Sequence, residues 1–120
     1  MAQSIFGSLE AQAIKLDASG QPKLDAQNHQ QLNDAAKLPS ISGPVNLGST
    51  GSYSLYATND GQVNDASAGA VYAISIGLTA APANFDPAYA IEVTVTVAWP
   101  FGAPAANQTR RDFVRIITSY

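Results

Sequence analysis

The chain contains one histidine, the natural first candidate for a catalytic base. His29 lies in the polar stretch QNHQQ, and the nearest acids in sequence are Asp25 and Asp34. A general base needs an orienting carboxylate and a nucleophile or substrate within hydrogen-bond reach. No Gly-x-Ser-x-Gly elbow occurs to present a serine nucleophile. We therefore predict an exposed histidine without a catalytic role and a protein that is not an enzyme. Burial of His29 beside Asp25 or Asp34 would reverse this prediction.

A second set of polar residues lies in the loop TNDGQVNDAS, residues 58–67. Carboxylate and amide oxygens suit calcium, and the loop offers two of each. The loop lacks the spacing of an EF-hand and its bidentate glutamate, and Asn and Asp also build ordinary turns. We favour the turn, keep Asp60 and Asp65 as the metal candidates, and expect no cofactor.

Two further acids, Glu92 and Asp112, lie on neighbouring predicted strands and are the candidates for an acid–base pair. A glutamate beside Arg111 or Arg115 on the next strand is more typical of a solvated cross-strand ion pair. We predict that ion pair rather than catalysis.

The aromatic residues offer one binding hypothesis. A cluster of rings would provide a platform for a sugar, although scattered aromatics on strands more often anchor the core or a strand end. The candidates are Tyr72, Tyr89, Trp99 and Tyr120. Asn107-Gln108-Thr109 also matches a glycosylation sequon.

The overall composition excludes several classes of protein. Of 120 residues, 46% are hydrophobic and 12% charged, which is too apolar for a disordered chain. The net charge is −3 with only six basic residues, so nucleic acid is not an expected partner. There is no cysteine, and no run of 18 apolar residues would span a bilayer.

The N-terminal third predicts one helix and a long connection. In residues 1–18 apolar side chains recur at steps of three and four, and Gly20 provides a stop. The stripe consists of Ile5, Phe6, Leu9, Ala13, Ile14 and Leu16. Residues 19–52 are rich in Gln, Asn, Ser, Gly and Pro and predict an irregular connection, with a turn or two of helix within 24–38.

Residues 53–120 show strand patterns. The stretch IEVTVTVAW alternates strictly, with Ile91, Val93, Val95 and Val97 on one face and Glu92, Thr94 and Thr96 on the other. The tripeptide Asn59-Asp60-Gly61 marks a hairpin turn. We predict a single α+β domain over residues 1–120, with the N-terminal helix packed on an antiparallel sheet of about four strands.

This order of elements resembles the type IV pilin-like and pseudopilin family, in particular the pilin-like cassette proteins of Verrucomicrobia. AQSIFGSLEAQ resembles the stretch just after the membrane-spanning half of the long pilin helix. YSLYATNDGQV is similar to the first sheet hairpin, and IEVTVTVAWPFGAPAANQTRRDFVRIITSY to the final one. The family's basic leader, peptidase site and C-terminal cysteines are absent. A leader and membrane helix of about 25 to 35 residues would then precede residue 1, since ~20 residues cross a bilayer.

The resemblance implies a non-catalytic structural subunit of a type IV pilus-like filament or a type II secretion pseudopilus. The full-length protein would be anchored in the inner membrane with a periplasmic or extracellular head, which by itself would be soluble. Its partners would be other pilin-like subunits, and Ile5, Phe6, Leu9 and Leu16 would supply the subunit-packing surface of the helix. The alternative is a small extracytoplasmic β-rich module that binds carbohydrate or protein, and it predicts an aromatic-lined groove.

Overall fold

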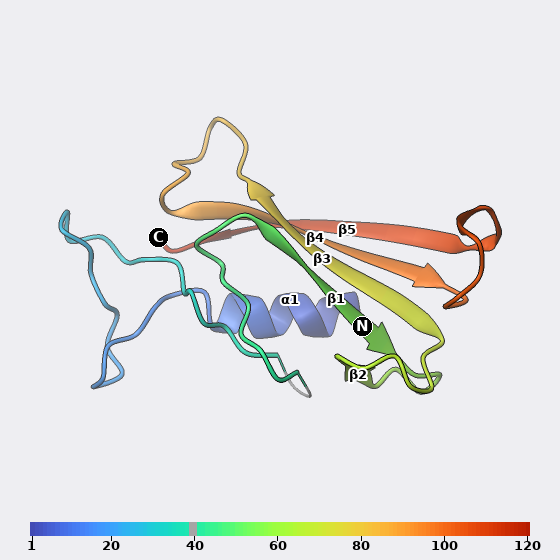
Figure 1. Cartoon of the computed structure of the whole chain (residues 1–120). Coiled ribbons are helices and arrows are strands. Elements are labelled where there is room, and N and C mark those ends of the chain that lie inside the picture. Colours follow the sequence, from blue (N-terminus) through green and yellow to red (C-terminus); the bar gives the residue numbers. More distant parts are fainter. Residues whose placement is uncertain (39–40) are drawn as a thin grey trace.

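The computed structural model describes residues 1–38 and 41–120 and shows one helix against a five-stranded antiparallel sheet (Figure 1). The spatial order of the strands is β2-β1-β3-β4-β5. The elements are α1 (Ala2–Ala11), β1 (Gly51–Ala57), β2 (Val63–Asn64), β3 (Tyr72–Ala80), β4 (Ala90–Trp99), the 3-10 helix η1 (Ala105–Asn107) and β5 (Thr109–Thr118). The predicted α+β arrangement is confirmed, with one strand more than the four expected. The additional strand, β2, pairs with the end of β1 across the predicted Asn-Asp-Gly turn.

The alternating pattern of the strands divides the sheet into two faces. On β4, Ile91, Val93, Val95 and Val97 are buried, whereas Glu92, Thr94 and Thr96 are partly exposed. On β3 the buried positions are Ile74, Ile76 and Leu78. We call the side that faces α1 the inner face and the opposite side the outer face. The predicted assignment of β4 side chains to these two faces is confirmed.

The helix is shorter than the predicted range of 1–18. It ends at Ala11 because Gln12, just beyond it, turns its side chain back onto the backbone. The Gln12 Nε2 donates to the carbonyl oxygens of Ser8 (3.0 Å) and Lys37 (2.6 Å), and Oε1 accepts the N–H of Lys37 (2.8 Å). This amide satisfies a carbonyl of the last helical turn and joins it to the following segment, so the apolar period beyond Ala11 does not continue the helix.

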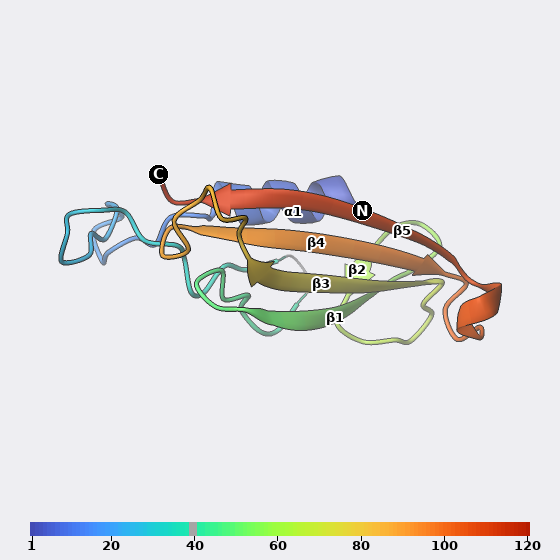
Figure 2. The ribbon, with the colours of Figure 1, turned by 90° about the horizontal axis from the view of Figure 1, so that it is seen from above.

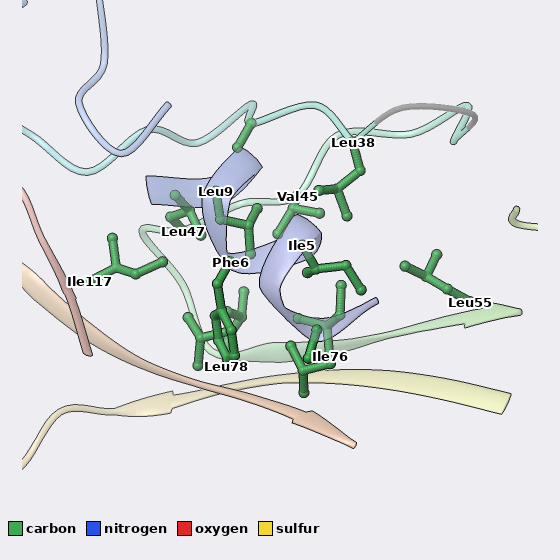
Figure 3. Close-up of a cluster of buried hydrophobic side chains, with 14 of the residues drawn as sticks. Ile5, Phe6, Leu9, Leu38, Val45, Leu47, Leu55, Ile76, Leu78 and Ile117 are labelled. Carbon is green, nitrogen blue, oxygen red and sulfur yellow. The ribbon is translucent and has the colours of Figure 1, made fainter. Parts of the chain in front are cut away.

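The core lies between the inner face and two covering segments. One is α1, through Ile5, Phe6 and Leu9; the other comprises residues 32–38 and 41–47. That second segment contributes Leu32, Ala36, Leu38, Val45 and Leu47. Figure 3 shows side chains from both covering segments and from the sheet gathered in one cluster. The sequence pattern predicts only the helix as a cover, because the second covering segment has no regular apolar period.

The segment between α1 and the core residue Leu32 forms two loops with the same hydrogen bonds. The Oδ1 of Asp17 accepts the N–H groups of residues 19 and 21, and the Oδ1 of Asp25 those of residues 27 and 29. The third residue after each aspartate has positive φ, 85° at Gly20 and 62° at Asn28. Glycine and asparagine tolerate that left-handed conformation better than other residues. The double loop protrudes at one end of the molecule (Figures 1 and 2).

The repeated tetrapeptide Lys-Leu-Asp-Ala explains why the two loops match. It occurs at residues 15–18 and again at residues 23–26, and each aspartate opens one loop. The described residues 24–38 contain no helical turn, so the expectation of one there is wrong. Aspartate side chains that bond to backbone N–H groups compete with helix formation, which is the physical reason for the difference.

Candidate functional site

His29 and Asp25, considered from the sequence as a base and its orienting acid, lie in the structure beside Tyr89 at the end of the sheet. The Tyr89 hydroxyl donates to Oδ2 of Asp25 at 2.6 Å. The His29 ring lies edge-on to the Tyr89 ring, with 5.0 Å between centroids. A pocket of about 420 Å³ opens beside them and is also lined by Asp86, Ser119 and Tyr120, among others.

Two groups beside this pocket, Asp25 and Tyr89, have shifted pKa values. The Tyr89 hydroxyl bond, followed by the His29 backbone N–H, holds the pKa of the Asp25 carboxyl below its usual value. The same bond raises the pKa of Tyr89 from 10.0 to about 12. Both shifts stabilise a neutral phenol bonded to a carboxylate, an arrangement that ties the protruding loop to the chain just before β4.

His29 itself has no geometry for base catalysis. Its side chain is exposed, as predicted, and its contact with Asp25 is made by the backbone N–H (3.0 Å) rather than the imidazole. Asp34 pairs with Lys15, whose Nζ lies 3.1 Å from Oδ2. Neither acid therefore orients the imidazole.

The bond between Tyr89 and Asp25 predicts a specific pH dependence. The raised pKa of Tyr89 gives a stabilisation that is present below pH 10 and is lost as pH rises toward about 12. The lowered pKa of Asp25 gives one that is present above its unfolded value near 3.8 and is lost as pH falls. Spectrophotometric titration will show one phenol ionising late, and Asp25→Asn will move that pKa back toward 10.

The matched control is Asp86→Asn. Asp86 raises the pKa of Tyr89 only by charge–charge interaction, and its contribution is the smallest of the four that raise this pKa. Its replacement should change the late titration much less than Asp25→Asn does. An equal effect of both variants, or no late phenol in the wild-type protein, would contradict the assigned hydrogen bond.

The two metal candidates each have protein partners. Asp60 accepts a hydrogen bond from the Thr58 hydroxyl, and Asp65 accepts the Ser42 N–H (3.0 Å) and hydroxyl (2.7 Å). These bonds lower the pKa of both carboxyls, chiefly through the Thr58 hydroxyl for Asp60 and the Ser42 N–H for Asp65. Across residues 1–38 and 41–120, no three His, Cys, Asp or Glu residues gather as metal ligands would. The Asp60 carboxylate bonds within its own turn, whereas the Asp65 carboxylate joins two segments that are 23 residues apart in sequence.

Glu92 and Asp112 lie on the outer face but are not partners. Glu92 pairs across the strands with Ile116, and its Oε2 accepts from the Thr79 hydroxyl at 3.2 Å. Asp112 accepts from the Thr96 hydroxyl at 2.7 Å, and the Arg110 Nε lies 3.5 Å away. No acid–base couple forms between the two.

The predicted ion pair between Glu92 and a β5 arginine is wrong. Arg111 and Arg115 pair in register with Val97 and Val93, which places them on the inner face, opposite to Glu92. Arg115 instead bonds to Oε1 of Glu10 at 3.0 Å and lies over the Phe6 ring, 5.2 Å from its centroid. The error came from not knowing the register between the two strands.

The four aromatic candidates do not form one platform. Tyr72 and Trp99 contact each other on the inner face, with ring centroids 5.9 Å apart, and pack against the core. Tyr89 lies beside His29, and Tyr120 is exposed at the chain end. The interpretation of Tyr72 and Trp99 as core anchors is confirmed. Asn107 of the sequon is exposed at the end of η1.

The helix stripe proposed for subunit packing is mostly occupied by the chain itself. Ile5 and Phe6 are 3% exposed and Leu9 is 0% exposed, because all three lie against the inner face. Leu16 is 57% exposed but lies beyond the helix, bridged to Pro22 in the first protruding loop. This corrects the expectation that these four residues share one contact surface on the helix.

Among the described residues 1–38 and 41–120, none covers a largely apolar strip of the inner face beyond the N-terminal end of α1. Strands β4 and β5 extend past that end of the helix (Figures 1 and 2). A pocket of about 330 Å³ opens there, lined by Met1, Ala2, Tyr72, Val97, Trp99, Arg111 and Phe113. Phe113 is 44% exposed although it lies in register with the buried Val95. Sequence periodicity placed Val97 on this face but did not predict an uncovered strip, since the strip depends on where α1 lies relative to the strands.

The comparisons with known proteins give no relative for this chain. No protein-family model matches it, and no curated protein or solved structure shows significant similarity to it. Within residues 1–38 and 41–120, no helix has the length and apolar character needed to cross a membrane.

Proposed function

We propose that the chain is the non-catalytic head of a pilin-like filament subunit, of the type IV pilus or type II secretion pseudopilus kind. The observation that carries the proposal is the uncovered apolar strip of the inner face around Phe113, at the N-terminal end of α1. A helix that continued α1 upstream would lie over this strip. Burial of the half-exposed Phe113 side chain, and of the remaining exposed parts of Tyr72 and Trp99, favours such a cover.

The order of the elements supports the same proposal. A helix is followed by an irregular connection and then by an antiparallel sheet whose last strand, β5, ends two residues before Tyr120. In this class of subunit the upstream helix anchors the protein in the inner membrane and packs on other subunits within the filament. The protruding loops, with Leu16 and Leu24 exposed, offer a second contact between neighbouring heads.

The test is Phe113→Asp in the native gene, in cells that carry it. A carboxylate in the strip would oppose apolar covering by a helix, so sheared filaments should contain several-fold less of this subunit. Val114→Asp is the matched control, because Val114 is also exposed but lies on the outer face of the same strand. Circular dichroism of both purified variants checks that each folds.

An equal loss with both variants would show that the strip has no special role. Absence of the wild-type chain from any filament or secretion-system fraction would overturn the proposal. The alternative, a small extracytoplasmic module that binds carbohydrate or protein, depends on a different surface, the outer face of the sheet.

A further inference from the structure

Within residues 1–38 and 41–120, no segment covers the outer face of the sheet. This face carries two rows of side chains that run across the strands and differ in chemistry. The first row runs Tyr56, Ala73, Ala98, Arg110 from β1 to β5. The second row runs Ser54, Ser75, Thr96, Asp112 on the same four strands. Adjacent strands lie about 4.8 Å apart, so each row spans about 14 Å.

The two rows form a trough rather than a flat surface. The small side chains of Ala73, Ala98 and Ser75 make its floor, and a pocket of about 360 Å³ opens over them. One wall is aromatic: Phe101, from the loop after β4, meets Tyr56 in a T-shaped pair with 5.3 Å between ring centroids and 83° between planes. The Phe101 N–H donates to the Val71 carbonyl at 2.7 Å, which holds this wall in place.

The opposite wall is polar and charge-balanced. Arg110 lies with its Nε 3.5 Å from Oδ1 of Asp112, and both side chains are more than half exposed. The Thr96 hydroxyl donates to the same Asp112 oxygen at 2.7 Å, which fixes the carboxylate at the edge of the trough. The Ser54 and Ser75 hydroxyls are exposed along the floor between the two walls.

We propose that this trough, which we call the outer trough, binds a neutral oligosaccharide. Sugar rings present an apolar C–H face that contacts aromatic side chains, together with hydroxyls that both donate and accept. The Tyr56–Phe101 wall matches the first feature, and Arg110, Asp112 and the serine hydroxyls match the second. The guanidinium and carboxylate balance each other, which favours a neutral sugar over an acidic one.

Other occupants fit the outer trough less well. A protein partner would need large apolar anchors at the centre of the contact, where this chain has alanine, serine and threonine. A nucleic acid would need clustered basic side chains, and the arginine here is paired with an aspartate. The inference goes beyond the proposed filament function and does not depend on it, because the trough and the uncovered strip lie on opposite faces.

The test uses the purified chain and four defined probes: cellohexaose, chitohexaose, xylohexaose and laminarihexaose. At least one should bind with a dissociation constant in the millimolar range or tighter by isothermal titration calorimetry. Amide chemical-shift changes in the ¹H–¹⁵N spectrum should then be largest at Ser54, Ser75 and Thr96. Phe101→Ala and Arg110→Met should each weaken binding about tenfold, as expected for the loss of ~1.4 kcal/mol.

Phe113→Ala is the matched control, since it removes a half-exposed aromatic ring from the inner face. It should leave sugar affinity unchanged. Failure of all four probes to bind the wild-type chain at millimolar concentration would overturn the inference, as would shift changes centred outside the outer trough. Binding is measured on the isolated chain, so the two proposals are tested independently. Absence of sugar binding would not contradict the filament proposal, and absence of the chain from filaments would not contradict sugar binding.

Discussion

Leu9→Ala is expected to lower the free energy of unfolding by about 2–5 kcal/mol, the range found for truncating a fully buried leucine. Leu9 is 0% exposed and belongs to the core cluster that α1 shares with the sheet and with residues 32–38 and 41–47. Little can collapse into the space it leaves, because the Gln12 amide ties the end of the helix to Lys37. Urea unfolding followed by circular dichroism measures the change.

Leu16→Ala is the matched control for that experiment. It makes the same chemical change at a position that is 57% exposed, so the free energy of unfolding should change by no more than about 0.5 kcal/mol. If the two variants lost similar stability, Leu16 would be buried and the assignment of the helix end at Ala11 would be wrong.

The second large effect concerns the two faces of β4. Val93→Asn should lower the free energy of unfolding by about 2.5–6 kcal/mol. About 1.5–3 kcal/mol comes from the lost burial of the valine. A further 1–3 kcal/mol comes from an amide left without partners in the core. Val93 is fully buried between Leu78 and Arg115 in the register of the sheet.

Thr94→Asn supplies the comparison, with the same new side chain one residue along the strand. Thr94 lies on the outer face, opposite Gly77, where the amide remains in contact with water. Its cost should stay within about 1 kcal/mol, the span of strand preferences. Thermal or urea unfolding of the pair distinguishes the faces, and a larger loss for Thr94→Asn would mean that they have been interchanged.

Strands were the part of the fold that the sequence predicted well. The period of two in β4 is unbroken from Ile91 to Val97, and a shift of one residue would expose every valine, so both the strand and its faces follow from the pattern. The strand order β2-β1-β3-β4-β5 could not be predicted from the pattern, because β2 is only two residues long and leaves almost no periodic signal.

The end of the helix and the second cover of the core were not predictable from periodicity. Ile14 and Leu16 continue a helical stripe, yet they form isolated bridges to Leu32 and Pro22. The deciding contacts are long-range, above all the Gln12 amide on Lys37. The two aspartate loops were predictable in principle, since the repeated Lys-Leu-Asp-Ala marks them, but their bonds required the structure.

The partners of the candidate site residues likewise depend on the register between neighbouring strands, which the sequence pattern does not give. Glu92 and Asp112 are both strand acids on one face, but the partner of Glu92 is Ile116. The outer trough joins Tyr56, Phe101 and Arg110, which are up to 54 residues apart in sequence and carry no motif. Only the pairing of four strands brings them together.

The most direct test of the filament proposal is to determine the native coding sequence upstream of residue 2. The account predicts a short basic leader followed by about 20 apolar residues, the length that crosses a bilayer, in frame with AQSIFGSL. Such a helix would continue α1 over the apolar strip at Phe113. A gene that begins at Met1, or that encodes a cleavable secretion signal there, would contradict the account and favour the ligand-binding module.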